Sequence, residues 1–145
     1  MKILFVCTGN TCRSPLAQAL AQKLFDEKKI DAQCESAGLC CGYGEEVSEN
    51  SRKIIAEKGI FFTHQSRPVT RPLLESSDMV VCMTAPHKQA LAPYVPADKL
   101  FEARDLIGEE VDDPYGRDIE AYRRCARQLE KLAAAIADRI TGSGE

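Results

Sequence analysis

Residues 2–15 read KILFVCTGNTCRSP, which places a thiol at the end of an apolar run and an arginine six positions after it. The run Lys2–Val6 is apolar and prone to β structure, so it predicts a short buried strand. Ser14 and Pro15 are typical of an N-cap and a first helical position. We therefore expect a strand, a loop and a helix in direct succession, with the helix ending near Lys29.

The loop between this strand and helix has the composition of an anion site. Successive backbone N–H groups converge in such a turn, and the following helix adds the positive end of its dipole. Gly9 and Asn10 readily adopt the positive φ that a tight cradle needs. Arg13 can bond two phosphate oxygens at once, and the same positive field favours the thiolate form of Cys7. The predicted phosphate loop consists of Thr8, Gly9, Asn10, Thr11, Cys12, Arg13 and Ser14. An inert core cysteine is the ordinary alternative for an isolated thiol, and the clustering of features here argues against it.

Short apolar runs and helical patterns alternate through the rest of the chain. Strands are expected at residues 32–35, 78–83 and 99–101. Helices are expected at 48–58, with Ile54, Ile55 and Ala56 facing inward, at 70–75, from Pro86 onward and at 118–140. This alternation predicts a doubly wound α/β fold, a parallel sheet flanked by helices on both faces. Ligands of such sheets bind at the carboxyl ends of the strands, where Cys7 lies.

Length and composition restrict the possible partners. The 145 residues contain no low-complexity linker or internal repeat, which predicts one domain over residues 1–145. A formal net charge of -3 argues against nucleic acid and against an anionic membrane. The chain has seven cysteines and no signal peptide, which predicts a reduced, cytoplasmic protein, and we expect a monomer. The cysteines lack paired C-x2-C spacing, so no metal and no cofactor are predicted.

A thiolate that takes a phosphoryl group needs a partner acid. A carboxylic acid can protonate the departing atom and then deprotonate the water that cleaves phosphocysteine. Residues 108–116, GEEVDDPYG, form a loop by their Pro and Gly content and carry four acids. Pro114 forces the preceding residue toward an extended conformation and so directs the side chain of Asp113. Asp112 is the alternative, and without the cysteine motif the stretch would be an ordinary solvated acidic loop.

Four motifs in this order resemble the low-molecular-weight protein tyrosine phosphatases: Cys7-x5-Arg13-Ser14-Pro15, Ser36-Ala37-Gly38, His64 and Asp113-Pro114-Tyr115-Gly116. The resemblance covers essentially the whole chain. It implies a flavodoxin-like sheet of four parallel strands, with Cys7 as nucleophile, Arg13 as phosphate clamp and Asp113 as general acid. It also implies that Ser36 and His64 join Asn10 and Ser14 in a hydrogen-bond network under the loop. Tyr115 is expected to flank the substrate, although packing into its own loop is equally compatible with the sequence.

The residue at position 11 bears on the substrate. Tyrosine phosphatases of this family usually carry a bulky apolar residue there, whereas CTGNTCRS resembles the bacterial branch that dephosphorylates phosphoarginine in proteins. Thr11 can hydrogen-bond a guanidine, while an aromatic ring favours an apolar wall. The acids around Asp113 favour a cationic guanidinium. We predict protein phosphoarginine as substrate and inorganic phosphate as product or inhibitor, with phosphotyrosine as the alternative.

The cysteines leave two further alternative functions to consider, and two parts of the predicted site remain unassigned. Arsenate reductases share this loop style, but Cys82 has no partner seven residues on. A redox-sensing or phospho-binding module is the other alternative, since Cys12 can trap Cys7 as a disulfide. Such a disulfide fits better with protection of a catalytic nucleophile from over-oxidation. Gln18 replaces the Glu with which many relatives pair the loop arginine. Residues 38–47 predict a loop over the pocket, and which of residues 39–44 wall the pocket stays open.

Overall fold

The computed structural model describes residues 1–142. Within them, one sheet has four parallel strands in the order β2-β1-β3-β4. The strands are β1 (Lys2–Cys7), β2 (Gln33–Gly38), β3 (Met79–Cys82) and β4 (Leu100–Glu102). The predicted doubly wound parallel sheet is confirmed, and the strand order is that of the flavodoxin-like arrangement.

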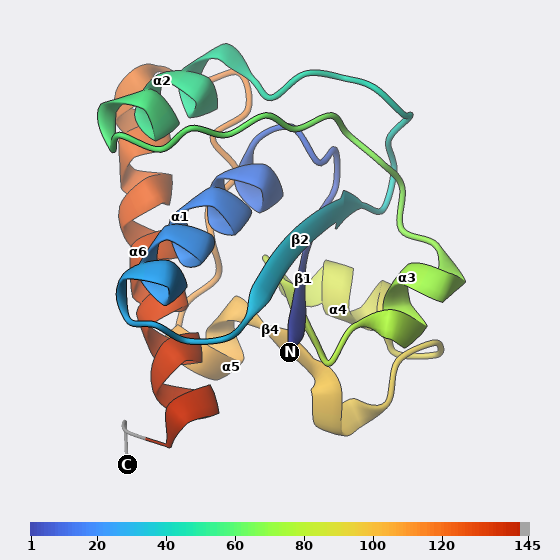
Figure 1. Cartoon of the computed structure of the whole chain (residues 1–145). Helices are drawn as coiled ribbons and strands as arrows, with labels where there is room; N and C mark the ends of the chain where they lie inside the picture. Colours follow the sequence, from blue (N-terminus) through green and yellow to red (C-terminus); the bar gives the residue numbers. More distant parts are fainter. Residues whose placement is uncertain (143–145) are drawn as a thin grey trace.

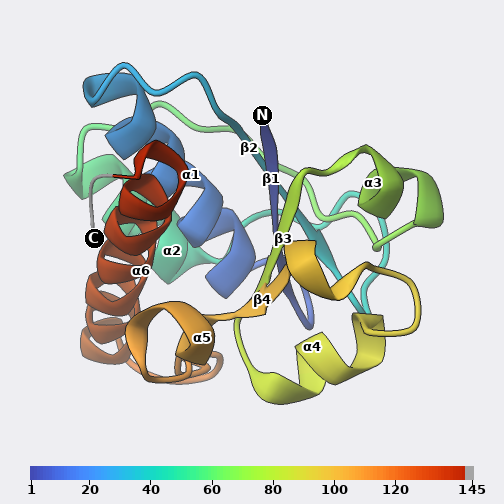
Figure 2. The same ribbon diagram turned by 90° about the horizontal axis from the view of Figure 1, so that it is seen from below.

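Helices cover both faces of this sheet (Figure 1). One face is covered by α1 (Arg13–Glu27), α2 (Glu49–Glu57), α5 (Ala103–Ile107) and α6 (Ile119–Thr141). The other is covered by α3 (Arg71–Ser76) and α4 (Ala85–Leu91), and a 3-10 turn, Ala97–Lys99, precedes β4. Figure 2 shows the two helical layers from below, with α6 beside α1 and with α3 and α4 across the sheet. No helix in residues 1–142 is long and apolar enough to cross a membrane.

The alternation of side chains along β1 feeds both layers of the core. Ile3, Phe5 and Cys7 lie in the core under α1 and α6, whereas Leu4 and Val6 lie in the core under α3 and α4. Successive residues of a strand point to opposite faces, so a strand covered on both sides is apolar throughout. This alternation turns Cys7 toward the layer that contains the loop and α1.

Several boundaries differ from those expected. Helix α1 begins at Arg13 with Cys12 as its N-cap, so the prediction of Ser14 as the cap is wrong. The hydroxyl of Ser14 is instead turned to Cys7 and Asn10. Strand β2 continues through Ser36 to Gly38. Ala56 is exposed rather than inward, while Ile54 and Ile55 are buried as predicted.

Candidate active site

The loop Thr8–Cys12 joins the end of β1 to α1, and three carbonyl groups along it bond to residues outside the loop. The carbonyl of Cys7 accepts from Leu39 N–H and that of Thr8 from Cys40 N–H. The carbonyl of Thr11 accepts from the backbone N–H of Ser48 at 2.8 Å. Because the C=O and N–H of a trans peptide point in opposite directions, the N–H groups of the same peptide planes face the inside of the loop. Inward N–H groups are what an anion-binding nest requires.

The sulfur of Cys7 lies at the floor of this nest, and the residue is 2% exposed. The backbone N–H of Asn10 donates to Sγ at 3.3 Å, and the Oγ of Ser14 lies 3.0 Å from it. Ser14 Oγ accepts a hydrogen bond from the side-chain amide of Asn10, so its own proton is free to point at the sulfur. The sulfur of Cys7 is therefore surrounded by hydrogen-bonding groups from the loop and from α1.

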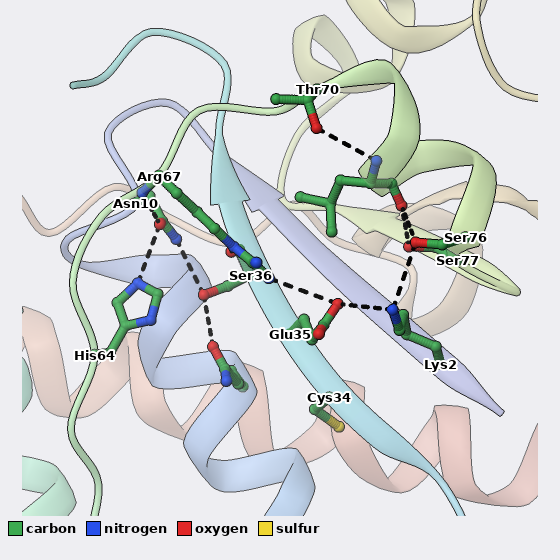
Figure 3. A network of polar contacts seen from close by, with 12 residues as sticks. Lys2, Asn10, Cys34, Glu35, Ser36, His64, Arg67, Thr70, Ser76 and Ser77 are labelled. Atoms are coloured by element: carbon green, nitrogen blue, oxygen red, sulfur yellow. Dashed lines mark hydrogen bonds and ion pairs between the residues drawn. The ribbon is translucent and has the colours of Figure 1, made fainter. Parts of the chain in front are cut away.

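Asn10 is the centre of a directed hydrogen-bond network under the loop, part of which Figure 3 shows. Its Oδ1 accepts from the backbone N–H of Arg67 at 3.0 Å, which fixes the orientation of the amide. Nε2 of His64 lies 3.0 Å from the same Oδ1, so this nitrogen must carry the proton. The amide nitrogen then donates to Ser14 and to Ser36. The structure thus brings together Asn10, Ser14, Ser36 and His64.

The backbone around this network is tightly constrained. Asn10 is fully buried with a φ of 55°, a conformation that Asn tolerates better than most residues. The end of β2 passes so close to the loop that a Cβ on Gly38 would lie 2.7 Å from the Thr8 carbonyl oxygen. Burial and the nearby Arg67 cation lower the pKa of His64, which keeps this ring neutral. These contacts constrain the conformation of the loop backbone.

Arg13 is 5% exposed and reaches over the nest from the first turn of α1. Its Nη1 donates to the carbonyl of Val111 at 3.2 Å, and its Nη2 lies 3.6 Å from Oδ2 of Asp113. The backbone N–H of Val111 donates in turn to the carbonyl of Met83, just past β3. Gln18 does not orient Arg13, since its Oε1 accepts from the hydroxyl of Ser36 at 2.7 Å.

Asp113 faces the nest from the loop before α6. Its Oδ1 accepts from the backbone N–H of Tyr115 at 3.1 Å, which leaves Oδ2 toward Arg13. Its side chain is 56% exposed, so a substrate can reach it. The backbone N–H of the neighbouring Asp112 donates to Gln128 on α6, and Asp113 but not Asp112 lines the small pocket. Of the two candidate acids, Asp113 is therefore the one at the pocket.

These groups surround a pocket of about 280 Å³. Its lining residues are Cys7, Thr8, Gly9, Thr11, Cys12, Arg13, Glu45, Asp113 and Tyr115. Glu45 was missed by the sequence reasoning, which sought the wall among residues 39–44. The segment around Glu45 is pinned to Ser66, whose N–H donates to the Glu45 carbonyl at 2.8 Å and whose Oγ accepts from the Glu45 N–H at 3.0 Å. No sequence motif signals this contact between two loops.

His87 and Tyr122 were also missed. His87 contacts Thr8 in the loop and Thr84 at the start of its own helix. The hydroxyl of Tyr122, on α6, lies 3.5 Å from Sγ of Cys12, and burial raises the pKa of this phenol to about 12. In sequence, each is a lone residue on a helix and carries no pattern of its own.

Two other hollows among residues 1–142 lack the combination found in the small pocket. These larger hollows, of about 660 and 640 Å³, lie on either side of the segment 60–63. Neither brings a thiol together with a nest of N–H groups, since Cys34 in the second is buried and its pKa is raised to about 12 by desolvation. Cys82 faces the core under α3 and α4, on the opposite side of the sheet from Cys7. It is therefore poorly placed for a thiol relay.

Comparison with known proteins gives consistent results. The family model for the low molecular weight phosphotyrosine protein phosphatase matches residues 2–143. A protein-arginine-phosphatase of Bacillus subtilis (strain 168) is 35% identical, with 97% of each chain covered. A low molecular weight protein-tyrosine-phosphatase, PtpB, of Staphylococcus haemolyticus is 35% identical over 94% of this chain and 97% of the relative.

Solved structures agree with these sequence relationships. The structure of the YwlE arginine phosphatase, as a C7S mutant with a phosphorylated active-site serine, superposes with a TM-score of 0.91 and 34% identity. The match covers 99% of this chain and 98% of that one. A low molecular weight protein tyrosine phosphatase from T. tengcongensis superposes with a TM-score of 0.90 and 32% identity, covering 96% and 99% of the two chains.

Proposed function

The chain belongs to the low molecular weight phosphotyrosine protein phosphatase family, and from that premise we propose that it dephosphorylates phosphoarginine side chains in proteins. The enzyme is a cysteine-dependent phosphatase that works through a phosphoenzyme intermediate. The phosphorylated serine in the mutant YwlE structure, at the position of the active-site residue, supports such an intermediate. The roles of individual residues follow from the geometry of the pocket.

In the first step, the thiolate of Cys7 attacks phosphorus, and the bond from phosphorus to the guanidino nitrogen breaks as the sulfur–phosphorus bond forms. The inward N–H groups and Arg13 bind the non-bridging oxygens, where the transferring phosphoryl group carries its charge. Asp113 gives a proton to the departing nitrogen, which keeps the electron pair of the broken bond, so that the cationic phosphoguanidinium group leaves as the guanidinium of arginine. Binding of phosphate draws the Arg13 guanidinium away from Asp113, which frees Oδ2 to hold that proton.

In the second step, water attacks the phosphocysteine. The carboxylate left on Asp113 takes a proton from this water as its oxygen bonds to phosphorus. The sulfur–phosphorus bond breaks, Cys7 returns to the thiolate and inorganic phosphate is released. The donors from Asn10 and Ser14 stabilise the thiolate as the leaving group of this step.

The choice of phosphoarginine rests on the polar, acidic wall of the pocket. Thr11, Glu45 and Asp113 contribute a hydroxyl, a carboxylate and the carboxyl group of the proposed acid around the place that the substrate side chain must cross. A guanidinium group offers N–H donors and positive charge to such a wall, whereas a phenyl ring has neither. The protein-arginine-phosphatase names of the Bacillus subtilis and Geobacillus stearothermophilus relatives support the same choice.

Side-by-side kinetics test the proposal. We expect kcat/KM on phosphoarginine peptides to exceed that on phosphotyrosine peptides of matched sequence, and Thr11→Ile to reverse the order. The loss of one polar contact should lower kcat/KM on phosphoarginine peptides about tenfold, and the gain of one apolar contact should raise kcat/KM on phosphotyrosine peptides about tenfold. A phosphotyrosine preference in the unmodified protein would contradict the proposal.

Protein-tyrosine phosphatase is the second candidate, and one observation favours it. Tyr115 lines the same pocket and is 76% exposed, so its ring is free to stack on a substrate ring. The staphylococcal relatives are named protein-tyrosine-phosphatases at similar identity. If this candidate holds, Tyr115→Ala will lower kcat/KM on phosphotyrosine peptides more than on phosphoarginine peptides.

A further inference from the structure

His87 and Thr8 make a contact that the reaction steps above do not use. His87 lies in the first turn of α4 and is 6% exposed. Its Nε2 is 2.9 Å from Oγ1 of Thr8, and its Nδ1 is 3.1 Å from Oγ1 of Thr84. Both ring nitrogens are engaged, so the ring is fixed between the end of β3 and the phosphate loop.

Thr8 lies where its side chain can contact both His87 and a substrate in the pocket. It directly follows Cys7, it is exposed, and it lines the pocket together with Arg13 and Asp113. Its carbonyl is bonded to Cys40 N–H, outside the nest. The hydroxyl bonded to His87 therefore belongs to a residue with a fixed backbone at the wall of the pocket.

The protonation of His87 limits how the three side chains can bond. Burial and the cation of Arg13 lower the pKa of His87 to about 4, although the carboxylates of Asp113 and Glu110 act in the opposite direction and raise it. Near pH 7 the ring is neutral, with one N–H donor and one acceptor nitrogen. Either Nε2–H donates to Thr8 while the Thr84 hydroxyl donates to Nδ1, or both bonds are reversed.

A bound phosphoryl group distinguishes these two arrangements. In the first, the Thr8 hydroxyl proton is free to point into the pocket. In the second, that proton is held by His87 and the oxygen lone pairs are left to face the anion. A dianion in a partly desolvated pocket attracts the donor and repels the lone pairs, so it selects the first arrangement.

We propose that His87 is a positioning residue that makes the Thr8 hydroxyl a hydrogen-bond donor to the bound phosphoryl group. The contact adds a side-chain donor to the backbone N–H groups and Arg13. The inference rests on the proposed function only in placing phosphate in this pocket. Direct binding of inorganic phosphate therefore tests it without any turnover.

The experiment measures the Kd of inorganic phosphate by calorimetry at pH 7 for six variants of the full chain. Thr8→Val removes the hydroxyl and keeps the shape, while Thr8→Ser keeps the hydroxyl. His87→Gln places an amide nitrogen near the position of Nε2, whereas His87→Asn places one near Nδ1. The fifth variant is the Thr8→Val/His87→Asn double variant, and the sixth is Gln89→Ala, an exposed control on the same helix.

We expect Thr8→Val and His87→Asn each to weaken phosphate binding about tenfold, the loss typical of one hydrogen bond to a charged group. The double variant should bind no more weakly than either single variant, because both remove the same contact. Thr8→Ser, His87→Gln and Gln89→Ala should stay within about threefold of the parent. In the phosphate complex, nitrogen NMR should find the proton of His87 on Nε2.

Other results overturn the inference. Parent-like affinity in Thr8→Val would show that the hydroxyl does not bind the anion. Losses that multiply in the double variant, or a His87→Gln protein as weak as His87→Asn, would show that His87 acts through the fold rather than through Thr8. Because Thr8 is exposed, its variants are expected to fold even if those of His87 do not. Failure of the parent to hydrolyse phosphoarginine while these phosphate results hold would reject the proposed function alone.

Discussion

The Oγ atom of Ser14 lies 3.0 Å from the Sγ atom of Cys7 and accepts a hydrogen bond from Asn10 at 2.8 Å. Ser14 lies in the first turn of α1 rather than at the cap, and the bond from Asn10 leaves its hydroxyl proton free to point at the sulfur. Ser14→Ala should lower kcat about tenfold or more, because a hydrogen bond to a charged group is worth about 1.5–3 kcal/mol. Iodoacetate should alkylate Cys7 more slowly at neutral pH. Ser76→Ala, on the exposed side of α3, is the control, and equal kinetics for the two variants would contradict this prediction.

Asp113→Asn should reduce kcat on phosphoarginine peptides by about 10²- to 10⁴-fold, the usual contribution of a general acid. The carboxylate faces Arg13 across the pocket, whereas the N–H of Asp112 is bonded to Gln128 on α6. Steady-state kinetics of Asp113→Asn and Asp112→Asn therefore compare two adjacent acids in different surroundings. A larger loss in Asp112→Asn would move the acid role to that residue.

Glu45→Gln should lower kcat/KM for phosphoarginine peptides by about two- to fivefold, since an exposed ion pair is worth roughly 0.5–1 kcal/mol. Activity on phosphotyrosine peptides should not fall, because a phenyl ring gains nothing from the carboxylate. Glu46→Gln is a matched control one residue away, where the side chain lines a different hollow. The difference between the two variants should shrink at high salt. Equal effects of the two substitutions would mean that only net charge matters.

Gly38→Ala should destabilise the protein by about 1–3 kcal/mol, the usual cost of overpacking. A methyl group there would lie 2.7 Å from the carbonyl oxygen of Thr8 and from Sγ of Cys41. Gly42→Ala is the comparison, because no atom lies within 4 Å of its added Cβ. Urea unfolding gives both free energies of unfolding. A Gly38→Ala protein as stable as Gly42→Ala would show that the strand end can move away from the loop.

Acid should destabilise the protein through His87. Its pKa is lowered to about 4 in the folded state, mainly by burial, so between its unfolded value of about 6.5 and about 4 the unfolded state binds more protons. Stability therefore falls as pH decreases through this window, by about 2–3 kcal/mol between pH 6.5 and 4.5. Urea unfolding at both pH values should give a smaller drop for His87→Gln. An equal drop in the two proteins would assign the acid sensitivity to carboxylates alone.

The local part of the site was determined by the sequence. Strand β1, the loop and α1 were predicted from residues 2–15 because a buried strand, a tight turn and a helix start each leave a short-range pattern. The spacing of Cys7 and Arg13 places the proposed nucleophile and the proposed phosphate clamp at the two ends of one loop. Alternating strands and helices likewise predicted the parallel sheet, since a parallel connection requires a crossover. Within this stretch the cap at Ser14 was misassigned, because its hydroxyl contacts Cys7 and Asn10 instead.

The tertiary structure decided which distant groups complete this site. Arg13 is held by the carbonyl of Val111, 98 residues away in sequence, and Thr8 by His87, 79 residues away. Glu45, which lines the pocket, is bonded to Ser66, and of the two adjacent acids it is Asp113 that lines the pocket. Such contacts join single side chains from separate elements, so they produce no periodicity and no fixed spacing. They exist only once the hydrophobic core has fixed the strands and helices relative to one another.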